Sequence, residues 1–228
     1  MRKLVSIVMP ALNEAACIEE VVSSVPVDEF AQRGYDTEIL VVDNNSDDGT
    51  GELARKAGAR VVYEPQRGYG CAYRRGFKEA KGNVICTLDA DRSYPVSILP
   101  EMVENLFHDD LDFISTNRFA FMHNGVMSRK NRFGNVILTL ASRALFRVPF
   151  RDSQSGMWVF RKEILEDMKL CATGMALSEE IKIEAGWRLR ARCIELPIHY
   201  GYRSGSPKLN AWRDGLGNLL FLVRKRLS

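Results

Sequence analysis

The sequence contains no hydrophobic run long enough to cross a membrane. A membrane-spanning helix needs roughly 18–20 consecutive apolar residues, and the longest apolar stretches are segments such as LVSIVMPAL near the start and LLFLV near the end. We therefore expect a protein that is not integral to a membrane. Pro10, Asn13 and Glu14 interrupt the first stretch where a secretory leader would carry small neutral residues, so it is interpreted as a strand followed by a turn. A cytoplasmic location is predicted.

Several common metal and cofactor motifs are missing as well. The five cysteines are odd in number and show neither a Cys-x-x-Cys pair nor a Cys/His metal-ligand spacing, which argues against a disulfide framework and a zinc site. No G-x-G-x-x-G follows the first apolar run, and no G-x-x-x-x-G-K-[ST] occurs anywhere. Neither a dinucleotide site of the Rossmann type nor a P-loop is therefore expected, and Gly68-Tyr69-Gly70 alone is weak support for either.

What the chain does contain is an uneven distribution of charge. Its 228 residues carry a formal net charge of +3. Residues 1–114 hold twelve Lys and Arg against twenty Asp and Glu, whereas residues 115–228 hold twenty against nine. This asymmetry indicates that the second half faces something anionic, such as phosphates, acidic lipid or nucleic acid. The length and the absence of a linker predict one domain, residues 1–228.

Strand-like and helix-like segments alternate through the first half. Strands are predicted over residues 4–10, 38–43, 59–64 and 83–91, with helices over about 15–25, 51–57 and 70–80 between them. Such alternation predicts an α/β fold with a mostly parallel central sheet flanked by helices, and ligands bind beyond the carboxyl ends of such strands. In the second half, strands are expected at 112–116, 155–161 and 192–200, and helices over about 131–146 and after Ser178.

Acidic and amide side chains follow three of the predicted strands. Asp89 and Asp91 come directly after the apolar run VICTL, and residues i and i+2 of an extended chain point the same way, about 6–7 Å apart. Two carboxylates so placed suit Mg²⁺ or Mn²⁺, which neutralises a diphosphate. The alternative is a polar turn after a strand. Asn13-Glu14 and Asp43-Asn44-Asn45 fit either helix caps or contacts to a nucleoside.

Six motifs in this order carry a resemblance across nearly the whole chain: PALNE, VVDNNSDDGT, RGYGCAYRRGF, LDADRSYP, DSQSGMWVFR and YRSGSPKL. They resemble family 2 glycosyltransferases, most closely the branch of dolichyl- and polyprenyl-phosphate sugar transferases. The resemblance implies an A-type glycosyltransferase fold with a Rossmann-like nucleotide-sugar-binding half, residues 1–114, and an acceptor-binding half, residues 115–228. It also implies a UDP- or GDP-sugar donor, Mg²⁺ or Mn²⁺, and inversion at the anomeric carbon.

The resemblance also implies roles by position. The expected nucleotide-sugar contacts are Pro10, Ala11, Asn13, Glu14, Asp43, Asn45, Gly70, Asp89, Ala90 and Asp91, with Asp89 and Asp91 also at the metal. The expected contacts to phosphates or acceptor are Arg118, Arg129, Ser155, Arg203 and Lys208, and catalytic roles are implied for Asp91, Gln154, Glu180 and Arg203. Ser93 stands where many polyprenyl-phosphate mannosyltransferases carry a glutamine that can contact the metal.

The acceptor decides whether a general base is needed. A phosphate monoester is mostly dianionic at neutral pH and attacks without losing a proton, whereas a hydroxyl acceptor would use Glu179 or Glu180 as base. The segment after Ser178 also fits a capped helix with acidic residues in its first turn.

Two amphipathic stretches complete the prediction. Apolar residues recur at helical spacing from Phe133 to Ala144 and from Trp212 to Val223, each with basic residues alongside, including Arg224-Lys225-Arg226. They fit either core packing with a solvated basic face or helices lying on an anionic membrane surface.

We therefore predict a metal-dependent, inverting transferase, peripheral on the cytosolic face of a membrane. It would move a sugar from a nucleotide-diphosphate sugar to dolichyl or undecaprenyl phosphate. A membrane-protein partner or a second copy of the chain is expected as a partner. Alternatives are a hydroxyl acceptor in cell-wall or polysaccharide synthesis and a nucleotide- or nucleic-acid-binding module. The last lacks a recognised nucleic-acid motif, so no nucleic acid is expected. A nucleotidyltransferase would need a Gly-rich basic loop where PALNEA stands.

Overall fold

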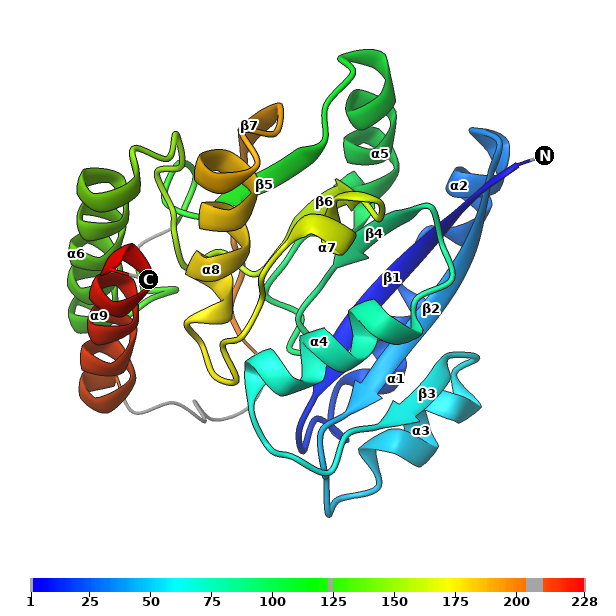
Figure 1. Ribbon diagram of the computed structural model, residues 1–228. Coiled ribbons are helices and arrows are strands. Elements are labelled where there is room, and N and C mark those ends of the chain that lie inside the picture. The colour runs from blue at the N-terminus through cyan, green and yellow to red at the C-terminus, as the bar shows by residue number, and fades with distance from the viewer. Residues whose placement is uncertain (1, 123–124, 204–210, 228) are drawn as a thin grey trace.

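The computed structural model describes residues 2–122, 125–203 and 211–227, and for residues 211–214 the backbone alone. Within these ranges the chain forms a seven-stranded sheet with the strand order β3-β2-β1-β4-β6-β5-β7 (Figure 1). Strand β6 runs antiparallel to both of its neighbours, and the other adjacent pairs are parallel. The mostly parallel sheet predicted from the sequence is confirmed. The strands are β1 (Lys3–Ala11), β2 (Tyr35–Asp43), β3 (Arg60–Tyr63), β4 (Val84–Thr87), β5 (Phe113–Asn117), β6 (Trp158–Arg161) and β7 (Cys193–Pro197).

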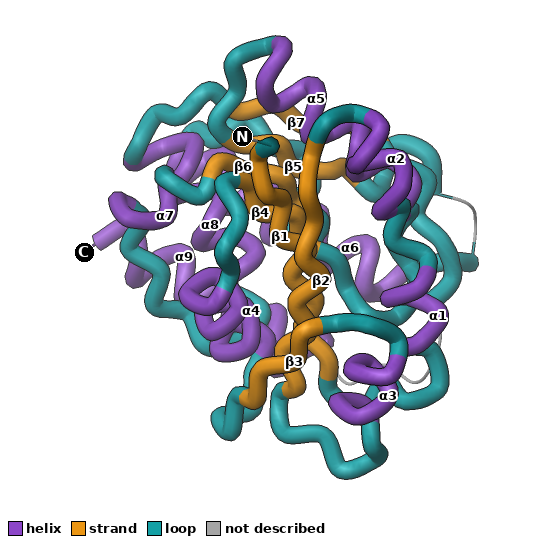
Figure 2. The backbone as a smooth tube through the Cα atoms, turned by 90° about the vertical axis from the view of Figure 1, so that its right-hand side faces the viewer, coloured by secondary structure: helices purple, strands orange, loops and turns teal. Residues whose placement is uncertain are grey.

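Helices cover both faces of the sheet (Figure 2). Those predicted over 51–57, 70–80 and 131–146 are present with small shifts at their ends, the first helix begins only at Ile18, and α2 and α5 were not predicted. The helices are α1 (Ile18–Ser23), α2 (Val27–Gln32), α3 (Thr50–Lys56), α4 (Tyr69–Glu79), α5 (Leu99–His108), α6 (Arg129–Phe146), α7 (Ile164–Asp167), α8 (Leu177–Ile183) and α9 (Ala211–Leu227), with single turns η1 (Val96–Ile98) and η2 (Glu184–Arg188).

The alternation of side chains along the strands builds two apolar layers. Ile7 and Met9 of β1 pack with α1, α2 and α5 on one face, while Val8 packs with α4 and α8 on the other. Because successive residues of a strand point to opposite faces, an uninterrupted apolar strand is buried on both. A Cβ at Gly76 would overlap the side chain of Val8, so α4 lies close against the sheet. This fixes the N-terminal end of α4 beside the carboxyl ends of β1 and β2.

The second half of the chain continues the same sheet. Strand β5 spans the predicted boundary at residue 114, and β6 is hydrogen-bonded between β4 and β5. Helices α6 and α9 pack against each other beyond this end of the sheet (Figure 1). Within the described residues, none of the helices combines the length and apolar character needed to cross a bilayer.

Candidate active site

The carboxyl ends of β1, β2 and β4 lie side by side, because these three strands are parallel neighbours. Ala11 and Asp43 are paired in register, and the backbone N–H of Asn44 donates to the carbonyl of Ala11 (2.8 Å). The loops that follow contain the predicted nucleotide-sugar residues. Pro10 and Ala11 form the end of β1 itself, and Ala11 is buried. The structure therefore gathers the first three acidic motifs at one edge of the sheet.

Side-chain contacts hold the first two of these loops together. The side-chain oxygen of Asn13 accepts from the backbone N–H of Asp47 (3.0 Å), and the N–H of Asn13 donates to Ser46 Oγ (3.0 Å). Asn13 itself has φ of 53°, in the left-handed region that asparagine tolerates. The N–H of Glu14 donates to Thr50 Oγ1 (2.8 Å). Asn13 and Glu14 are thus fixed by the polar residues of the neighbouring loop.

The other residues predicted on this side also have defined places. Asp43 accepts the backbone N–H of Ser46 (3.0 Å) at the end of β2. Asn45 accepts from the Tyr63 hydroxyl (2.9 Å). A Cβ at Gly70 would overlap the carbonyl oxygen of Ala172, so this glycine lets the start of α4 contact the loop before α8. Gly70 therefore has a packing role, and its predicted donor contact stays a prediction.

Asp89 and Asp91 lie beyond β4, where the chain leaves the sheet. Asp91 is buried; one of its oxygens pairs with Arg203 Nε (3.0 Å), and the other accepts from the N–H (3.1 Å) and the hydroxyl (2.5 Å) of Ser93. Arg203 also reaches the carboxylate of Glu14 (3.8 Å). Ser93 thus contacts Asp91 at the position where the resemblance expects a glutamine. The backbone carries Ala90 between the two acids, buried against the core.

Asp89 carries the electrostatic signature of a cation site. Burial, and then the neighbouring charge of Asp91, raise the pKa of Asp89 to about 7. A carboxylate pair in this condition gains from a bound cation, which neutralises both groups. Within the described ranges no three His, Cys, Asp or Glu side chains are placed to share a metal. The oxygen donors fit Mg²⁺ or Mn²⁺, which usually completes its coordination with substrate phosphates and water.

The loop over residues 152–156 approaches Asp89 from the other half of the chain. A Cβ at Gly156 would overlap the Tyr69 hydroxyl and lie 3.3 Å from a carboxylate oxygen of Asp89. The N–H of Gly156 donates to the Tyr94 hydroxyl (2.8 Å). Ser155 is fully buried, with its hydroxyl 2.6 Å from Thr116 Oγ1. Because a side chain at residue 156 would meet Tyr69 and Asp89, a glycine there lets the loop approach the acidic pair. The loop therefore lies directly beside the expected donor site.

Arg118 binds the same loop from the end of β5. Its Nε and Nη2 contact the two carboxylate oxygens of Asp152 at 2.7 and 2.9 Å, and its backbone N–H donates to Asp152 as well (3.0 Å). Both side chains are almost fully buried. Burial would raise the pKa of Asp152, but the charge and hydrogen bonds of Arg118 hold it below its usual value. Arg118, predicted as a phosphate contact, is already neutralised by a buried partner.

Lys182, which the sequence analysis did not single out, holds the backbone of the loop over residues 152–156. Lys182 of α8 is 1% exposed, and its Nζ donates to the carbonyls of Asp152 (2.9 Å), Ser153 (3.0 Å) and Ser155 (2.8 Å). Burial lowers the pKa of Lys182 to about 7. No sequence pattern singles out Lys182. The structure shows that every residue of its segment, LSEEIKI, is buried. A lone lysine in a helix is normally solvated.

Gln154 and Glu180 are both buried, with their polar atoms engaged. Gln154 Nε2 donates to Ser153 Oγ (3.3 Å), and its Oε1 accepts from Asn218 of α9 (3.2 Å). Glu180 accepts the backbone N–H groups of Cys171 (2.9 Å) and Ala172 (2.8 Å) and pairs with Lys225 (2.9 Å). These contacts account for Glu180 as a link between the loop before α8 and α9. Its catalytic role stays a prediction.

The last three predicted or alternative residues differ in their surroundings. Arg129 is exposed at the first turn of α6, and Lys208 lies outside the described residues. Glu179, the alternative base, is fully buried, and its carboxylate interacts with Lys182, Ser153 and Gln154. Burial raises the pKa of Glu179 well above its ordinary value, which favours the neutral acid over a base.

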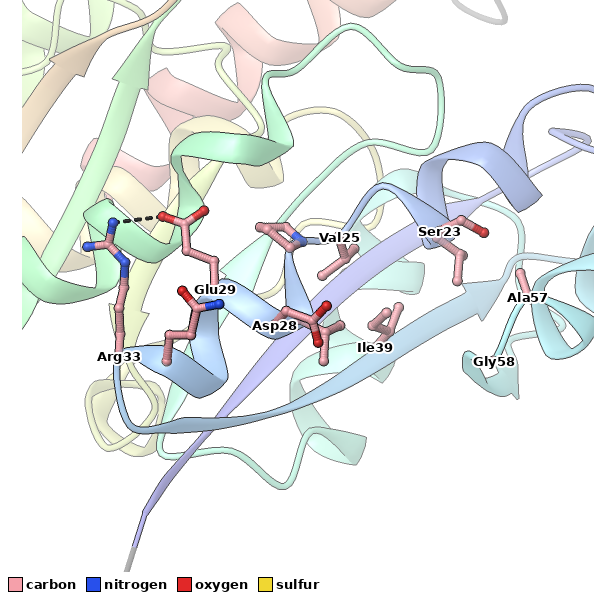
Figure 3. Close-up of a pocket in the computed structure, with 12 residues that line it drawn as sticks. Ser23, Val25, Asp28, Glu29, Arg33, Ile39, Ala57 and Gly58 are labelled. Carbon is pink, nitrogen blue, oxygen red and sulfur yellow. Dashed lines mark hydrogen bonds and ion pairs between the residues drawn. The ribbon is translucent and has the colours of Figure 1, made fainter.

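A separate hollow of about 910 Å³ lies beside α2 and β2 (Figure 3). It is lined by residues such as Val25, Asp28 and Ile39, and Arg33 pairs with Glu29 at 2.7 Å on its wall. None of the predicted site residues lines it. The candidate active site is therefore the edge formed by the loops after β1, β2 and β4 together with residues 152–156.

Comparison with known proteins identifies the family. The profile of glycosyl transferase family 2 matches residues 6–169. The glycosyltransferase AglJ of Haloferax volcanii is 33% identical over 220 residues, covering 96% of this chain and 70% of the relative. The dolichyl-phosphate hexose transferase of the same organism is 32% identical over 210 residues, covering 92% and 88%.

Solved structures confirm the A-type glycosyltransferase fold. The glucosyl-3-phosphoglycerate synthase of Mycobacterium tuberculosis, solved with Mn²⁺, UDP and its glucosylated product, superposes with a TM-score of 0.75 at 23% identity. The match covers 98% of this chain and 80% of that one. The profile match over most of the chain and the relatives above show the family, and this chain belongs to glycosyl transferase family 2.

Proposed function

We propose that this enzyme transfers a sugar, with inversion, from a UDP- or GDP-sugar to the phosphate of a polyprenyl lipid such as dolichyl or undecaprenyl phosphate. The observation that carries the proposal is the adjacency of two different surfaces. The acidic pair and Arg203 suit a metal-bound diphosphate, and the loop over residues 152–156 connects that pair to α9, which exposes apolar side chains. The dolichyl-phosphate hexose transferase among the relatives supports the same acceptor class.

At the donor end, Asp89 and Asp91 would hold Mg²⁺ or Mn²⁺, which supplies positive charge to the diphosphate. Arg203 contacts Asp91 through Nε, so its guanidinium lies within reach of the phosphates that the acidic pair would receive. There it stabilises the negative charge that develops on the leaving nucleoside diphosphate. Glu14, Asp43 and Asn13 are held at the strand ends by their neighbours, and we assign them to the nucleoside.

At the acceptor end, an oxygen of the lipid phosphate forms a bond to the anomeric carbon as the bond to the donor diphosphate breaks. The acceptor is mostly dianionic at neutral pH, so the step requires no proton transfer. This chemistry suits a site in which Glu180 is ion-paired and Glu179 is fully buried with a raised pKa. Residues 152–156 are held by Lys182 and Arg118, and we assign this loop to orienting the acceptor.

The membrane contact is assigned to the outer faces of α6 and α9, named here the apolar face. Phe133 is 68% exposed, Leu140 58% and Leu216 61%, which is unusual for large apolar side chains in a water-facing bundle. Basic residues at both helices suit anionic lipid headgroups, each adding about 1 kcal/mol near such a surface. The apolar face comprises Phe133, Val136, Ile137, Leu140, Leu216, Leu220, Val223 and Leu227.

A transfer assay tests the proposed function. Labelled UDP- and GDP-sugars are incubated with polyprenyl phosphate in vesicles containing Mg²⁺ or Mn²⁺, and the lipid fraction is analysed for sugar linked through phosphate. We expect label in the lipid with one of the two nucleotide classes, and its loss with EDTA. Dolichol, which carries a hydroxyl in place of the phosphate, is the matched control. Transfer to dolichol but not to the phosphate would replace the proposal with the hydroxyl-acceptor alternative.

A further inference from the structure

Helix α9 presents two different faces. Asn218, Leu222 and Lys225 follow one another at spacings of four and three residues, which places them on one side of a helix. Asn218 is 6% exposed and Leu222 is fully buried, so this side faces the protein. Leu216, Leu220, Val223 and Leu227 repeat at the same spacing on the other side and are exposed.

The inner side of α9 combines polar and apolar contacts. Lys225 Nζ lies between the carboxylates of Glu180 (2.9 Å) and Glu184 (2.7 Å), both of them buried, and it also donates to the carbonyl of Lys169 (2.9 Å). Within residues 215–227 Leu222 is fully buried, and Phe221 is half-buried and packs against the same core. The position of α9 therefore depends on these contacts and on whatever covers its outer side.

The second polar contact of α9 reaches residues 152–156, named here the acceptor loop. Asn218 Nδ2 donates to Oε1 of Gln154, whose amide nitrogen donates to Ser153 Oγ. Lys182 of α8 fixes the backbone of this loop through its carbonyl groups. The side-chain oxygen of Gln154 is instead held from α9. A displacement of α9 thus leaves the loop backbone and the Gln154–Ser153 contact in place, and it removes the hydrogen bond that fixes the side-chain oxygen of Gln154.

We propose that Asn218 is a positioning residue through which contact of α9 with an anionic membrane orients Gln154 in the acceptor loop. The inference rests on the proposed function for the membrane contact and the acceptor. Burial of the outer leucines in a bilayer adds further apolar stabilisation to the docked helix. The docked position of α9 becomes more populated, and Gln154 is held for the acceptor. Membrane binding then lowers the acceptor KM even when the acceptor is supplied in solution.

The kinetic test uses Asn218→Ala in the full chain. The acceptor is a short-chain, water-soluble prenyl phosphate, assayed with and without acceptor-free vesicles of phosphatidylglycerol and phosphatidylcholine. We expect vesicles to lower the acceptor KM of the wild type, and Asn218→Ala to raise that KM about two- to tenfold, the factor that one neutral hydrogen bond contributes. Donor KM and vesicle binding should not change. Asn105→Ala, a half-buried asparagine in α5, is the matched control.

Hydrogen exchange supplies a second readout that requires no turnover. Vesicles should slow amide exchange over residues 152–156 in the wild type and in Asn105→Ala, and have no effect there in Asn218→Ala. Equal protection by vesicles in all three proteins would overturn the inference, as would an unchanged acceptor KM in Asn218→Ala. A wild type that transfers no sugar to lipid phosphate refutes the proposed function instead. The exchange result then still decides whether membrane contact reaches the loop.

Discussion

The proposed donor edge, formed by the loops after β1, β2 and β4, and the proposed acceptor side, formed by residues 152–156 with α8 and α9, are stabilised in different ways. At the donor edge, short polar side chains at strand ends bond to the loop beside them, as Asn13 does with Ser46 and Asp47. On the acceptor side, buried charges from distant segments hold the structure, as in Arg118 with Asp152 and Lys225 with Glu180. The first arrangement costs little when one contact is lost. In the second, losing one partner leaves an unpaired charge in the interior.

The largest expected effect is on the donor edge, in Asp91→Asn. The variant keeps the size of the side chain but removes the charge that pairs with Arg203 and would hold the cation. We expect transfer to fall by about 100- to 1000-fold with either Mg²⁺ or Mn²⁺, the loss typical of removing one preorganised electrostatic group. Thermal unfolding should change little.

The control for this variant is Asp28→Asn, an exposed acid that lines the separate hollow of Figure 3. It should retain full activity. Normal turnover in Asp91→Asn would show that Asp91 does not hold the metal. A comparable loss in Asp28→Asn would indicate that the separate hollow takes part in the reaction.

On the acceptor side, Lys182→Met should lower the free energy of unfolding. The substitution leaves three buried carbonyls without their shared donor and the neighbouring carboxylates without a cation. We expect the free energy of unfolding in urea to fall by about 3 kcal/mol. Lys162→Met is the control, because its Nζ is half-buried and donates to one carbonyl, that of Ala80 (2.6 Å). Equal losses in the two variants would show that the loop does not depend on Lys182.

The same lysine predicts a pH dependence of stability. Burial lowers the pKa of Lys182 from 10.5 to about 7, so between these values the unfolded chain binds more protons at this site than the folded chain. Stability contributed by this group therefore rises with pH over that window. The difference in unfolding free energy between wild type and Lys182→Met should widen from pH 7 to pH 9.5. A constant difference would mean that Lys182 has its ordinary pKa in the folded protein.

A smaller effect is expected at the apolar face. Leu216→Ser combined with Leu220→Ser removes two exposed leucines without disturbing the buried side of α9. We expect binding to phosphatidylglycerol vesicles in a sedimentation assay to weaken about thirtyfold, because each of the two leucines that enter a bilayer contributes on the order of 1 kcal/mol. Val27→Ser on α2, also an exposed apolar position, should bind as the wild type does. Unchanged binding in the double variant would place the membrane contact elsewhere.

At the proposed donor edge, the sequence predicted the clustering of acidic residues but not the local geometry of the pair. Strand β4 ends at Thr87 rather than at residue 91, so Asp89 and Asp91 lie in the turn that follows it and not in extended chain. Their charges still interact, as the raised pKa of Asp89 shows. The acceptor side depends on contacts across the chain that no local pattern records. Lys182 has the sequence of a solvated helix residue but is buried. Lys225, expected with Arg224 and Arg226 on a basic surface, turns inward between two carboxylates. That expectation was wrong for Lys225.

The prediction of the fold likewise succeeded for some elements and failed for others. The alternating segments of the first half predicted strands β1 to β4 and the helices between them, because each of these apolar strands is separated from the next by a helical segment. Helices α2 and α5 were not predicted. Pro26 is the N-cap residue of α2, and Pro100 lies in the first turn of α5, where proline is well tolerated. The exposure of Phe133 and Leu140 decides against core packing for the outer side of α6.

Calorimetric titration with UDP and GDP, each with Mn²⁺ and with EDTA, tests the central claim most directly. That claim is that Asp89 and Asp91 at the end of β4 hold a cation for a nucleoside diphosphate. We predict that one of the two nucleotides binds with Mn²⁺, that EDTA abolishes this binding, and that Asp91→Asn abolishes it as well. Binding of equal strength in EDTA, or in Asp91→Asn, would contradict the claim.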